Sequence, residues 1–243
     1  MAGKAKSVYL TINPKGTFKT AFHKVFFDAK SYNEYVKTDE FKAKWPAEEF
    51  DIVKETYWDN KMKTWITSDL HFGHKNIMKF CPQTRARFRD DVGYMNSAMV
   101  EEWNAKVEPE DLVYILGDVA FMSGSDAGKT MHRLNGRKIL VEGNHDRKTL
   151  MDATFRGAFE EVHKYLDITY DGHKCVMSHY PFLEWDQMHR GALHFFGHLH
   201  GGTTGMEKYR CMDVGMDSTG EIVISMDRAV RMIKDNEIKG HHV

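Results

Sequence analysis

Five short polar clusters interrupt this sequence, and each follows directly after an apolar stretch that favours a buried strand. They are Asp69-Leu70-His71, Gly117-Asp118, Gly143-Asn144-His145-Asp146, Ser178-His179 and Gly197-His198-Leu199-His200. In open α/β sheets, the loops after the carboxyl ends of the strands converge on one crevice. We therefore expect the five clusters to face a single site, although they span 132 positions of the sequence.

The residue types in these clusters are typical of a metal site. Carboxylate oxygen, amide oxygen and imidazole nitrogen bind Mn²⁺, Fe or Zn²⁺, and no cysteine lies in any cluster. In an extended chain, residues i and i+2 point the same way, so both members of Asp69-x-His71 and of His198-x-His200 can reach one site. The clusters offer seven ligands, too many for one ion of ordinary coordination number. Two ions about 3.5–4 Å apart that share one carboxylate would use them all.

Hydrophobic periodicity predicts alternating strands and helices from residue 63 onward. The expected strands are 65–68, 112–116, 138–141, 160–170, 173–178, 193–197, 208–214 and 221–226, and the expected helices are 90–107, 126–134, 148–155 and 227–234. Because the order begins β-α-β-α-β and ends rich in strands, we expect helices flanking a sheet or two stacked sheets.

Residues 1–62 differ in character from the rest of the chain and contain none of the five clusters. The expected elements are a strand at 8–12, a turn at 13–16, a segment at 18–27 that is ambiguous between strand and helix, and a strand at 50–58. Ser31 with Glu34 resembles a capping box, which predicts one helix that runs to about Lys44. The sequence thus predicts a small α+β addition at 1–62 and a second domain at 63–243.

The totals weigh against two classes of protein. A formal net charge of −1 gives no whole-molecule field for nucleic acid or an anionic membrane, although a local basic groove would not change that total. No run of about 18 apolar residues is present for a membrane span, and the N-terminus lacks the apolar core of a secretory signal. The 3 widely spaced cysteines do not form a disulfide framework. We expect a cytoplasmic protein with no membrane association.

The ordered series D-x-H, G-D, G-N-H-D, H and G-H-x-H resembles the signature of the calcineurin-like metallophosphoesterase superfamily. All five blocks are present in order with their glycines, and the resemblance covers about residues 63–226. It implies an α/β (α+β) fold in which two stacked sheets are flanked by helices, an αββα sandwich. It also implies a hydrolase that acts on phosphoester bonds with two divalent ions, Mn²⁺ first, with Fe, Zn²⁺ or Ni²⁺ as alternatives.

The resemblance further implies a role for each residue of the blocks. One ion would be held by Asp69, His71 and His200, the second by Asn144, His179 and His198, and Asp118 would bridge them. A hydroxide that bridges the ions would attack phosphorus, and His145 would face the leaving group and protonate the departing oxygen. Asp146 would orient His145 or a metal-bound histidine.

Three further residues are candidates for contact with the substrate. His74 follows the first cluster, where it would either touch the substrate or cap a helix that begins near Lys75. Arg85 belongs to a basic run that could hold a phosphate through two hydrogen bonds, although a solvated loop is the commoner role of such a run. Arg147 follows the third cluster and has the same two interpretations.

The blocks also narrow the choice of phosphoester. Serine/threonine protein phosphatases resemble this chain but continue with D-R-G after their G-D block and then have G-N-H-E. Here Val119-Ala120-Phe121 follows Asp118, and the later block ends in Asp146. The chain also lacks room for the extra domains of double-strand-break repair nucleases. We therefore expect a small phosphodiester, such as a cyclic nucleotide or a nucleic-acid end, with a phosphomonoesterase or another nuclease as alternatives.

A function of another class is a catalytically silent metal-binding adaptor that recruits a protein partner through residues 1–62. Such a protein would be expected to lack one or more ligands or the Asn-His pair, and none of these is missing here. The sequence leaves open the exact substrate, the identity of the metal, the oligomeric state and the role of residues 1–62.

Overall fold

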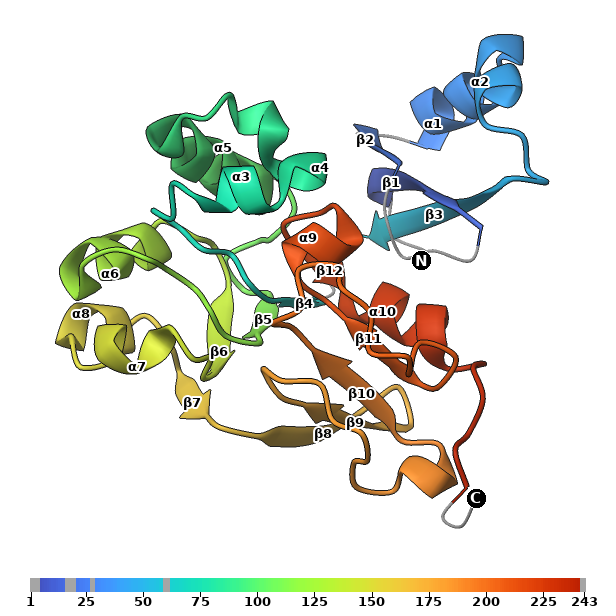
Figure 1. Ribbon diagram of the computed structural model, residues 1–243. Helices are drawn as coiled ribbons and strands as arrows, with labels where there is room; N and C mark the ends of the chain where they lie inside the picture. The colour runs from blue at the N-terminus through green and yellow to red at the C-terminus, as the bar shows by residue number, and fades with distance from the viewer. Residues whose placement is uncertain (1–4, 16–20, 27–28, 59–61, 241–243) are drawn as a thin grey trace. The chain divides into compact units, whose positions relative to one another are not determined.

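The computed structural model describes residues 5–15, 21–26, 29–58 and 62–240 (Figure 1). The chain forms two compact units, Met1–Met62 and Lys63–Val243. All five polar clusters lie in the second unit. Within the described residues, no helix is both long enough and apolar enough to cross a membrane.

The first unit contains a three-stranded antiparallel sheet. β1 (Ala5–Pro14) is the central strand, between β2 (Phe22–Phe26) and β3 (Phe50–Trp58). The segment that was ambiguous in the sequence therefore forms a strand over β2, while 16–20 and 27–28 lie outside the described residues. Alternate residues of β1 share one face of the sheet. The β1 residues on this face pack in an apolar core that contains Val8, Leu10, Ile12, Phe26, Tyr32 and Phe41.

The single helix predicted from Ser31 to Lys44 is wrong, because the chain forms two helices there. α1 (Ala29–Val36) begins before Ser31, and α2 (Asp39–Lys44) begins after Thr38. The hydroxyl of Thr38 accepts a hydrogen bond from Phe41 N at 3.2 Å. A hydroxyl at this position satisfies an N–H group that the first turn of a helix leaves without a partner, so it favours a new helix start.

The second unit contains two sheets. The first consists of β4 (Thr64–Thr67), β5 (Leu112–Ile115), β6 (Arg137–Val141), β7 (Glu161–His163) and β12 (Ile224–Ser225), in the order β12-β4-β5-β6-β7. The second consists of β8 (Leu166–Tyr170), β9 (His173–Met177), β10 (Leu193–Phe196) and β11 (Cys211–Asp213), in the order β11-β10-β9-β8.

The five polar clusters follow the ends of five strands that pair in parallel within their sheets. β4, β5 and β6 pair in parallel, with Thr67 opposite Ile115 and Ile115 opposite Leu140. In the second sheet, β9 and β10 are parallel to each other. Each of these five strands is followed within a few residues by one cluster. Because parallel strands end at the same edge of a sheet, each sheet presents its clusters together.

Helices accompany both sheets in the second unit (Figure 1). They are α3 (Ile77–Phe80), α4 (Pro82–Arg85), α5 (Val92–Asn104), α6 (Gly124–His132), α7 (Asp146–Thr149), α8 (Ala153–Arg156), α9 (Met216–Thr219) and α10 (Met226–Ile233), with 3₁₀ turns η1 (Ala86–Phe88) and η2 (Met188–Arg190). α5 buries Met95, Met99 and Trp103, which recur at helical spacing. Asp91 begins this helix by accepting hydrogen bonds from two backbone N–H groups of the first turn.

The segment predicted as one strand at 160–170 forms two strands that belong to different sheets. β7 pairs in parallel with β6, whereas β8 pairs antiparallel with β9. The chain passes from one sheet to the other through Lys164 and Tyr165, in the yellow segment of Figure 1. The helix predicted at 148–155 is likewise divided, into α7 and α8. The predicted α/β class, with two sheets and flanking helices, is confirmed.

Candidate metal centre

The expected ligands meet where the strands end. Three groups of three side chains have their ligand atoms within 4.8 Å of one another, and two of them consist of expected ligands, namely Asp69 with His71 and His200, and Asp118 with His179 and His198. The third is Cys81 with His200 and Asp217. The members of each group of expected ligands come from both sheets, because the first two clusters follow the five-stranded sheet and the last two follow the four-stranded sheet.

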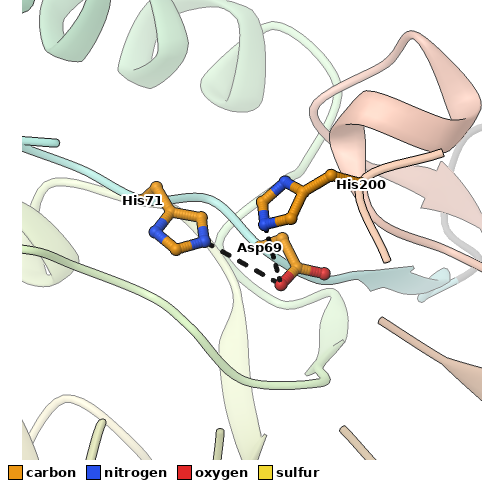
Figure 2. A group of neighbouring side chains, drawn as sticks. All are labelled: Asp69, His71 and His200. Atoms are coloured by element: carbon orange, nitrogen blue, oxygen red, sulfur yellow. Dashed lines mark ion pairs between the residues drawn. The ribbon is translucent and has the colours of Figure 1, made fainter. Parts of the chain in front are cut away.

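Figure 2 shows the first group, in which both histidine rings point toward the carboxylate of Asp69. His71 Nε2 lies 3.9 Å and His200 Nε2 lies 3.8 Å from Asp69 Oδ1. Among the described residues, neither Asp69 Oδ1 nor either ring nitrogen of His71 has a hydrogen-bond partner, and both side chains are buried. Unpaired buried polar atoms cost free energy, and a divalent ion would satisfy them. The donor set therefore fits a metal ion.

Asp118 lies between the two groups. Its Oδ2 is 3.7 Å from His71 Nε2 and 3.6 Å from His179 Nε2. Asn144 Oδ1 lies 2.9 Å from His179 Nε2, so the amide oxygen and the imidazole approach the same point. A carboxylate that meets one imidazole of each group has the position that a shared ligand of two ions needs.

The protonation of the His179 ring is fixed by a backbone oxygen. Nδ1 lies 2.8 Å from the carbonyl oxygen of Leu116, which can only accept a hydrogen bond, so Nδ1 carries the proton. Nε2 faces Asp118 and Asn144, and an ion bound between them would take its lone pair. A carbonyl behind a metal-binding imidazole holds the ring orientation in this way.

Five expected ligands have a left-handed backbone. The angle φ is 55° at Asp69, 51° at His71, 53° at Asp118, 74° at His198 and 49° at His200, and only nine non-glycine residues in the described part of the chain have a positive φ. Such conformations cost about 1–3 kcal/mol each and persist only where the surroundings hold them. The D-x-H and H-x-H pairs therefore converge through left-handed turns, and the extended geometry expected from the sequence is wrong.

Two glycines of the clusters allow the loops to approach each other closely. A side chain at Gly143 would collide with the carboxylate and the backbone nitrogen of Asp118. A side chain at Gly197 would collide with Ser68 and with the carboxylate of Asp69. The first contact joins two loops of the five-stranded sheet, and the second lets a loop of the four-stranded sheet reach a ligand of the other sheet. Both contacts explain why glycine recurs in the clusters.

His145 lies beside the ligands and is 42% exposed. Its Nε2 is 3.9 Å from Asp118 Oδ2, and its backbone N–H donates to Asp118 Oδ1 at 2.9 Å. Its ring packs edge to face against the rings of His71 and Phe121. This imidazole is therefore next to the ligand atoms and open to solvent, where it can meet an oxygen of a bound molecule.

Asp146 does not have the role expected from the sequence. Its buried carboxylate accepts three backbone hydrogen bonds of 2.9 Å each, from Asp118 N, Val119 N and Gly143 N. Burial raises the pKa of Asp146, and these N–H groups oppose part of that rise. No hydrogen bond joins its side chain to a histidine among the described residues. Asp146 holds the backbone of two clusters together and does not orient a ring.

Arg85 is fully buried, so the structure does not agree with the expected contact to substrate. Its Nε and Nη2 donate to the two carboxylate oxygens of Asp217 at 2.8 and 2.9 Å. Its Nη2 and Nη1 also donate to the backbone oxygens of Asp69 and Leu70, at 2.7 and 3.0 Å. The guanidinium thus ties α4 to α9 and to the loop of the first cluster.

Asp217 belongs to the site although the sequence did not single it out. Its Oδ2 lies 2.7 Å from His200 Nδ1, and its Oδ1 accepts a hydrogen bond from Thr84 Oγ1 at 2.6 Å. Burial alone would raise the pKa of Asp217, but His200 and Arg85 hold it below its usual range. A carboxylate behind a metal-binding imidazole orients the ring and makes it a stronger ligand.

Burial disfavours the charged forms of the side chains in the first group. It raises the pKa of Asp69 well above its usual range, and the nearby Asp213 carboxylate adds to that rise. It lowers the pKa of His71 to about 2, so this imidazole keeps its lone pair at neutral pH. Burial also opposes protonation of His200, yet the hydrogen bonds and charges around it, above all Asp217, raise its pKa to about 10. An ion bound here would replace a proton on His200.

His74 lies close to the first group. Its ring centroid is 5.3 Å from that of His71 and 4.4 Å from that of Phe121. α3 begins only at Ile77, and the His74 side chain makes no capping hydrogen bond to it. Of its two expected roles, the helix cap is therefore wrong and contact with the substrate stays a prediction.

Arg147 lines a cleft of about 390 Å³ whose lining also includes Asn144 and His179. Its side chain is 83% exposed, and its only ion pair among the described residues is to Glu142, with Nε 3.8 Å from Oε1. Unlike Arg85, it is open to a molecule that enters the cleft.

The sequence matches the family model of the calcineurin-like phosphoesterases over residues 62–215, more than half of the chain. An uncharacterized protein of Methanocaldococcus jannaschii is 28% identical over 182 residues, which cover 72% of this chain and 94% of that protein. The Gene 66 protein of Mycobacterium phage L5 is 30% identical over 193 residues, which cover 66% of this chain and 89% of that protein.

A solved structure supports the same fold. The protein of unknown function from Aquifex aeolicus aligns with 71% of this chain and 100% of its own, with a TM-score of 0.57 at 24% identity. The segment matched by the family model contains all five clusters and both groups of ligand atoms. The chain therefore belongs to the calcineurin-like phosphoesterase family and is a metal-dependent phosphoester hydrolase.

Proposed function

We propose that this protein is a phosphodiesterase that uses two divalent ions, Mn²⁺ in the first instance, on a small or nucleotide-type substrate. The observation that carries the proposal is the pair of ligand groups joined by Asp118, with unpaired buried atoms on Asp69 and His71. Asp69, His71 and His200 would hold one ion, Asn144, His179 and His198 the other, and Asp118 both. Ions bound there would add positive charge at the phosphoryl oxygens and lower the pKa of a coordinated water.

The chain's own contribution to the reaction comes from His145. The departing oxygen of a phosphoester needs a proton, and an imidazole can supply it near neutral pH. Asp118 accepts the backbone N–H of His145 and lies within 3.9 Å of its ring, so the histidine is held beside the shared ligand. The Asp146 carboxylate supports this arrangement, because it accepts hydrogen bonds from the backbone N–H groups of Asp118 and Gly143 in the two clusters.

A diester is favoured over a monoester because space is available for a second substituent on phosphorus. The cleft of about 390 Å³ is lined by Asn144 and His179, two of the proposed ligands, and also by residues outside the ligand set, such as Arg147 and Lys164. His145, which would face the leaving group, does not line the cleft, so the single organic substituent of a phosphomonoester placed at His145 would leave the cleft unused. A cytoplasmic location, and a partner-binding role for residues 1–62 beside a catalytic domain at 63–243, stay predictions.

The test begins with metal-stripped protein and an aryl phosphodiester, an aryl phosphomonoester and single-stranded nucleic acid as substrates. Mn²⁺, Ni²⁺, Zn²⁺ or Mg²⁺ is then added in turn, and His145→Ala and Asp118→Asn are measured beside the unmodified protein. His132→Ala serves as the control, because His132 is exposed at the end of α6. We expect metal-restored cleavage of the diester that the first two variants lose and the control keeps.

Other outcomes would point to the alternatives. Preference for the monoester would indicate a phosphomonoesterase, and cleavage of the nucleic acid alone would indicate a nuclease, for which activity should fall steeply with added salt. Two ions bound per chain without turnover of any ester would favour the metal-binding adaptor.

A further inference from the structure

The cleft beside the second group of ligands has walls of a distinct chemistry. Asn144 and His179 belong to its lining, so a substrate whose phosphorus lies at the ions would have the cleft beside it for a substituent. Its volume of about 390 Å³ lies near the lower end of small-molecule sites, which span roughly 300–1,000 Å³. That volume suits one small organic unit and not a duplex.

Two cations line this cleft. Lys164 is exposed and forms no ion pair or hydrogen bond with any other described residue. Arg147 meets Glu142 at 3.8 Å, and an exposed pair at this distance contributes little to stability. Glu142 is the only acidic residue among the described residues that line the cleft, so this lining has an excess of positive charge. A second anionic group of the substrate would give both cations a partner.

Aromatic rings form another part of the wall. Tyr180 is 47% exposed although its ring packs against those of His179 and His198, with centroids 5.0 and 4.6 Å away. The Phe182 ring is stacked on the buried ring of His194, with centroids 5.1 Å apart and planes 8° apart, and on the ring of Tyr165, with centroids 6.2 Å apart. These rings are thus held by their neighbours, and a preorganised aromatic wall binds planar groups at a low entropic cost.

We propose that the cleft is a nucleotide subsite, in which the base packs against Tyr180 and Phe182 while a phosphate other than the one being cleaved binds Lys164 and Arg147. This inference rests on the proposed function, because that function sets the position of the scissile phosphate. A planar ring and a second phosphate on one small unit are the chemistry that this wall matches. A sugar phosphate without a base would use the cations alone, and an aryl ester without a second phosphate would use the rings alone.

Binding measurements can separate the contribution of the second phosphate from that of the base. The readout is calorimetry with Mn²⁺-loaded protein. The probes are adenosine 3′,5′-bisphosphate, adenosine 5′-monophosphate and ribose 5-phosphate, which share one phosphate and differ by the second phosphate or the base. We expect the second phosphate and the base each to tighten binding about tenfold, the effect of a charge-assisted contact or of one stacked base.

The variants should remove one contribution each. Lys164→Met combined with Arg147→Met should abolish the preference for the bisphosphate, and Tyr180→Leu should abolish the preference for the base. Lys148→Met is the charge control, since Lys148 is exposed next to Arg147 and does not line the cleft. Tyr94→Leu is the aromatic control, since Tyr94 is also 47% exposed and lies outside the cleft.

Equal binding of the three probes by the unmodified protein would overturn the subsite, and so would preferences that the cleft variants keep. Turnover of bis(p-nitrophenyl) phosphate by the unmodified protein separates this result from a failure of the proposed function. Turnover of the diester without a preference among the three probes would support the proposed function and contradict the subsite. Probe preferences that the variants abolish, without turnover, support the subsite and contradict the diesterase.

Discussion

The Nδ1 atom of His200 donates a hydrogen bond to Asp217 Oδ2 at 2.7 Å, and the Nε2 atom of the same ring faces Asp69. One imidazole therefore connects a buried carboxylate to the first group of ligands. Arg85 and Thr84 hold the far side of that carboxylate, so the orientation of His200 depends on residues that never touch an ion.

Asp217→Asn should weaken binding of the first ion. An asparagine cannot accept from His200, Arg85 and Thr84 together, and loss of such a partner typically lowers metal affinity about 10–100-fold. Calorimetric titration of the stripped protein with Mn²⁺ should then show one weakened and one unchanged site. Asp126→Asn, at an exposed position of α6, is the control. Two unchanged affinities would contradict an orienting role for Asp217.

Arg85→Met should destabilise the second unit strongly. The substitution leaves the buried Asp217 carboxylate without its main ion pair, and breaking a buried pair from one side costs about 3–5 kcal/mol. Arg87→Met is a matched control, because Arg87 pairs with Glu102 at the surface, where the loss is about 0.2–1 kcal/mol. Urea unfolding of metal-free protein measures both free energies. Similar values for the two variants would mean that the Arg85 contacts are not the ones holding this region.

His194 should make stability depend on pH below neutrality. Burial lowers the pKa of His194 from 6.5 to about 4, and its Nε2 accepts the N–H of Phe182. The unfolded chain therefore binds a proton first, so the free energy of unfolding falls as the pH drops from 6.5 toward 4. The full loss is about 3 kcal/mol, and it levels off below the folded pKa.

The contribution of His194 is isolated by comparison with His194→Gln, whose amide oxygen can still accept the Phe182 N–H. Denaturant unfolding at a series of pH values should show the gap between the two proteins closing, or reversing, as the pH falls through this window. Parallel curves would show that another group causes the pH dependence.

Gly143→Ala should impair the site more than the fold. The new methyl group would collide with Asp118, so the shared ligand must shift and metal-dependent activity should fall at least tenfold, the effect of about 1.4 kcal/mol. Gly93→Ala is the control, because a methyl group there meets only the Asp91 side chain at 3.3 Å in the first turn of α5. Equal activities would show that the Asp118 loop has room to move.

The sequence was sufficient for the fold class and for the cluster residues that converge. These depend on local signals, namely an apolar strand followed by ligand residues, and the chain repeats that signal five times. The geometry was less accessible. The left-handed φ values at Asp69 and His71 occur where their backbone N–H groups donate to the loop after β5, a long-range contact that spacing cannot predict, so the extended pairing inferred from spacing was wrong.

Long-range relationships could not be read from the pattern. Arg85 and Asp217 are 132 positions apart, and a lone aspartate at the start of a four-residue helix has no spacing relation to His200. The strand predicted at 160–170 failed for a similar reason. Periodicity describes which face of a strand is buried, and it cannot say that Glu161–His163 and Leu166–Tyr170 add to different sheets.

The pairing of β4 with β12 has a consequence for the order in which the protein folds and binds its ions during synthesis. β4 carries the first cluster near the start of the second unit, yet one of its two neighbours in the sheet comes from Ile224–Ser225. His198 and His200 also leave the ribosome after every other proposed ligand. A nascent chain can assemble β4, β5 and β6 early, but it can complete the second ligand group only after His198 and the first only after His200. Loading of both ions should therefore be one of the last events in the biogenesis of this enzyme.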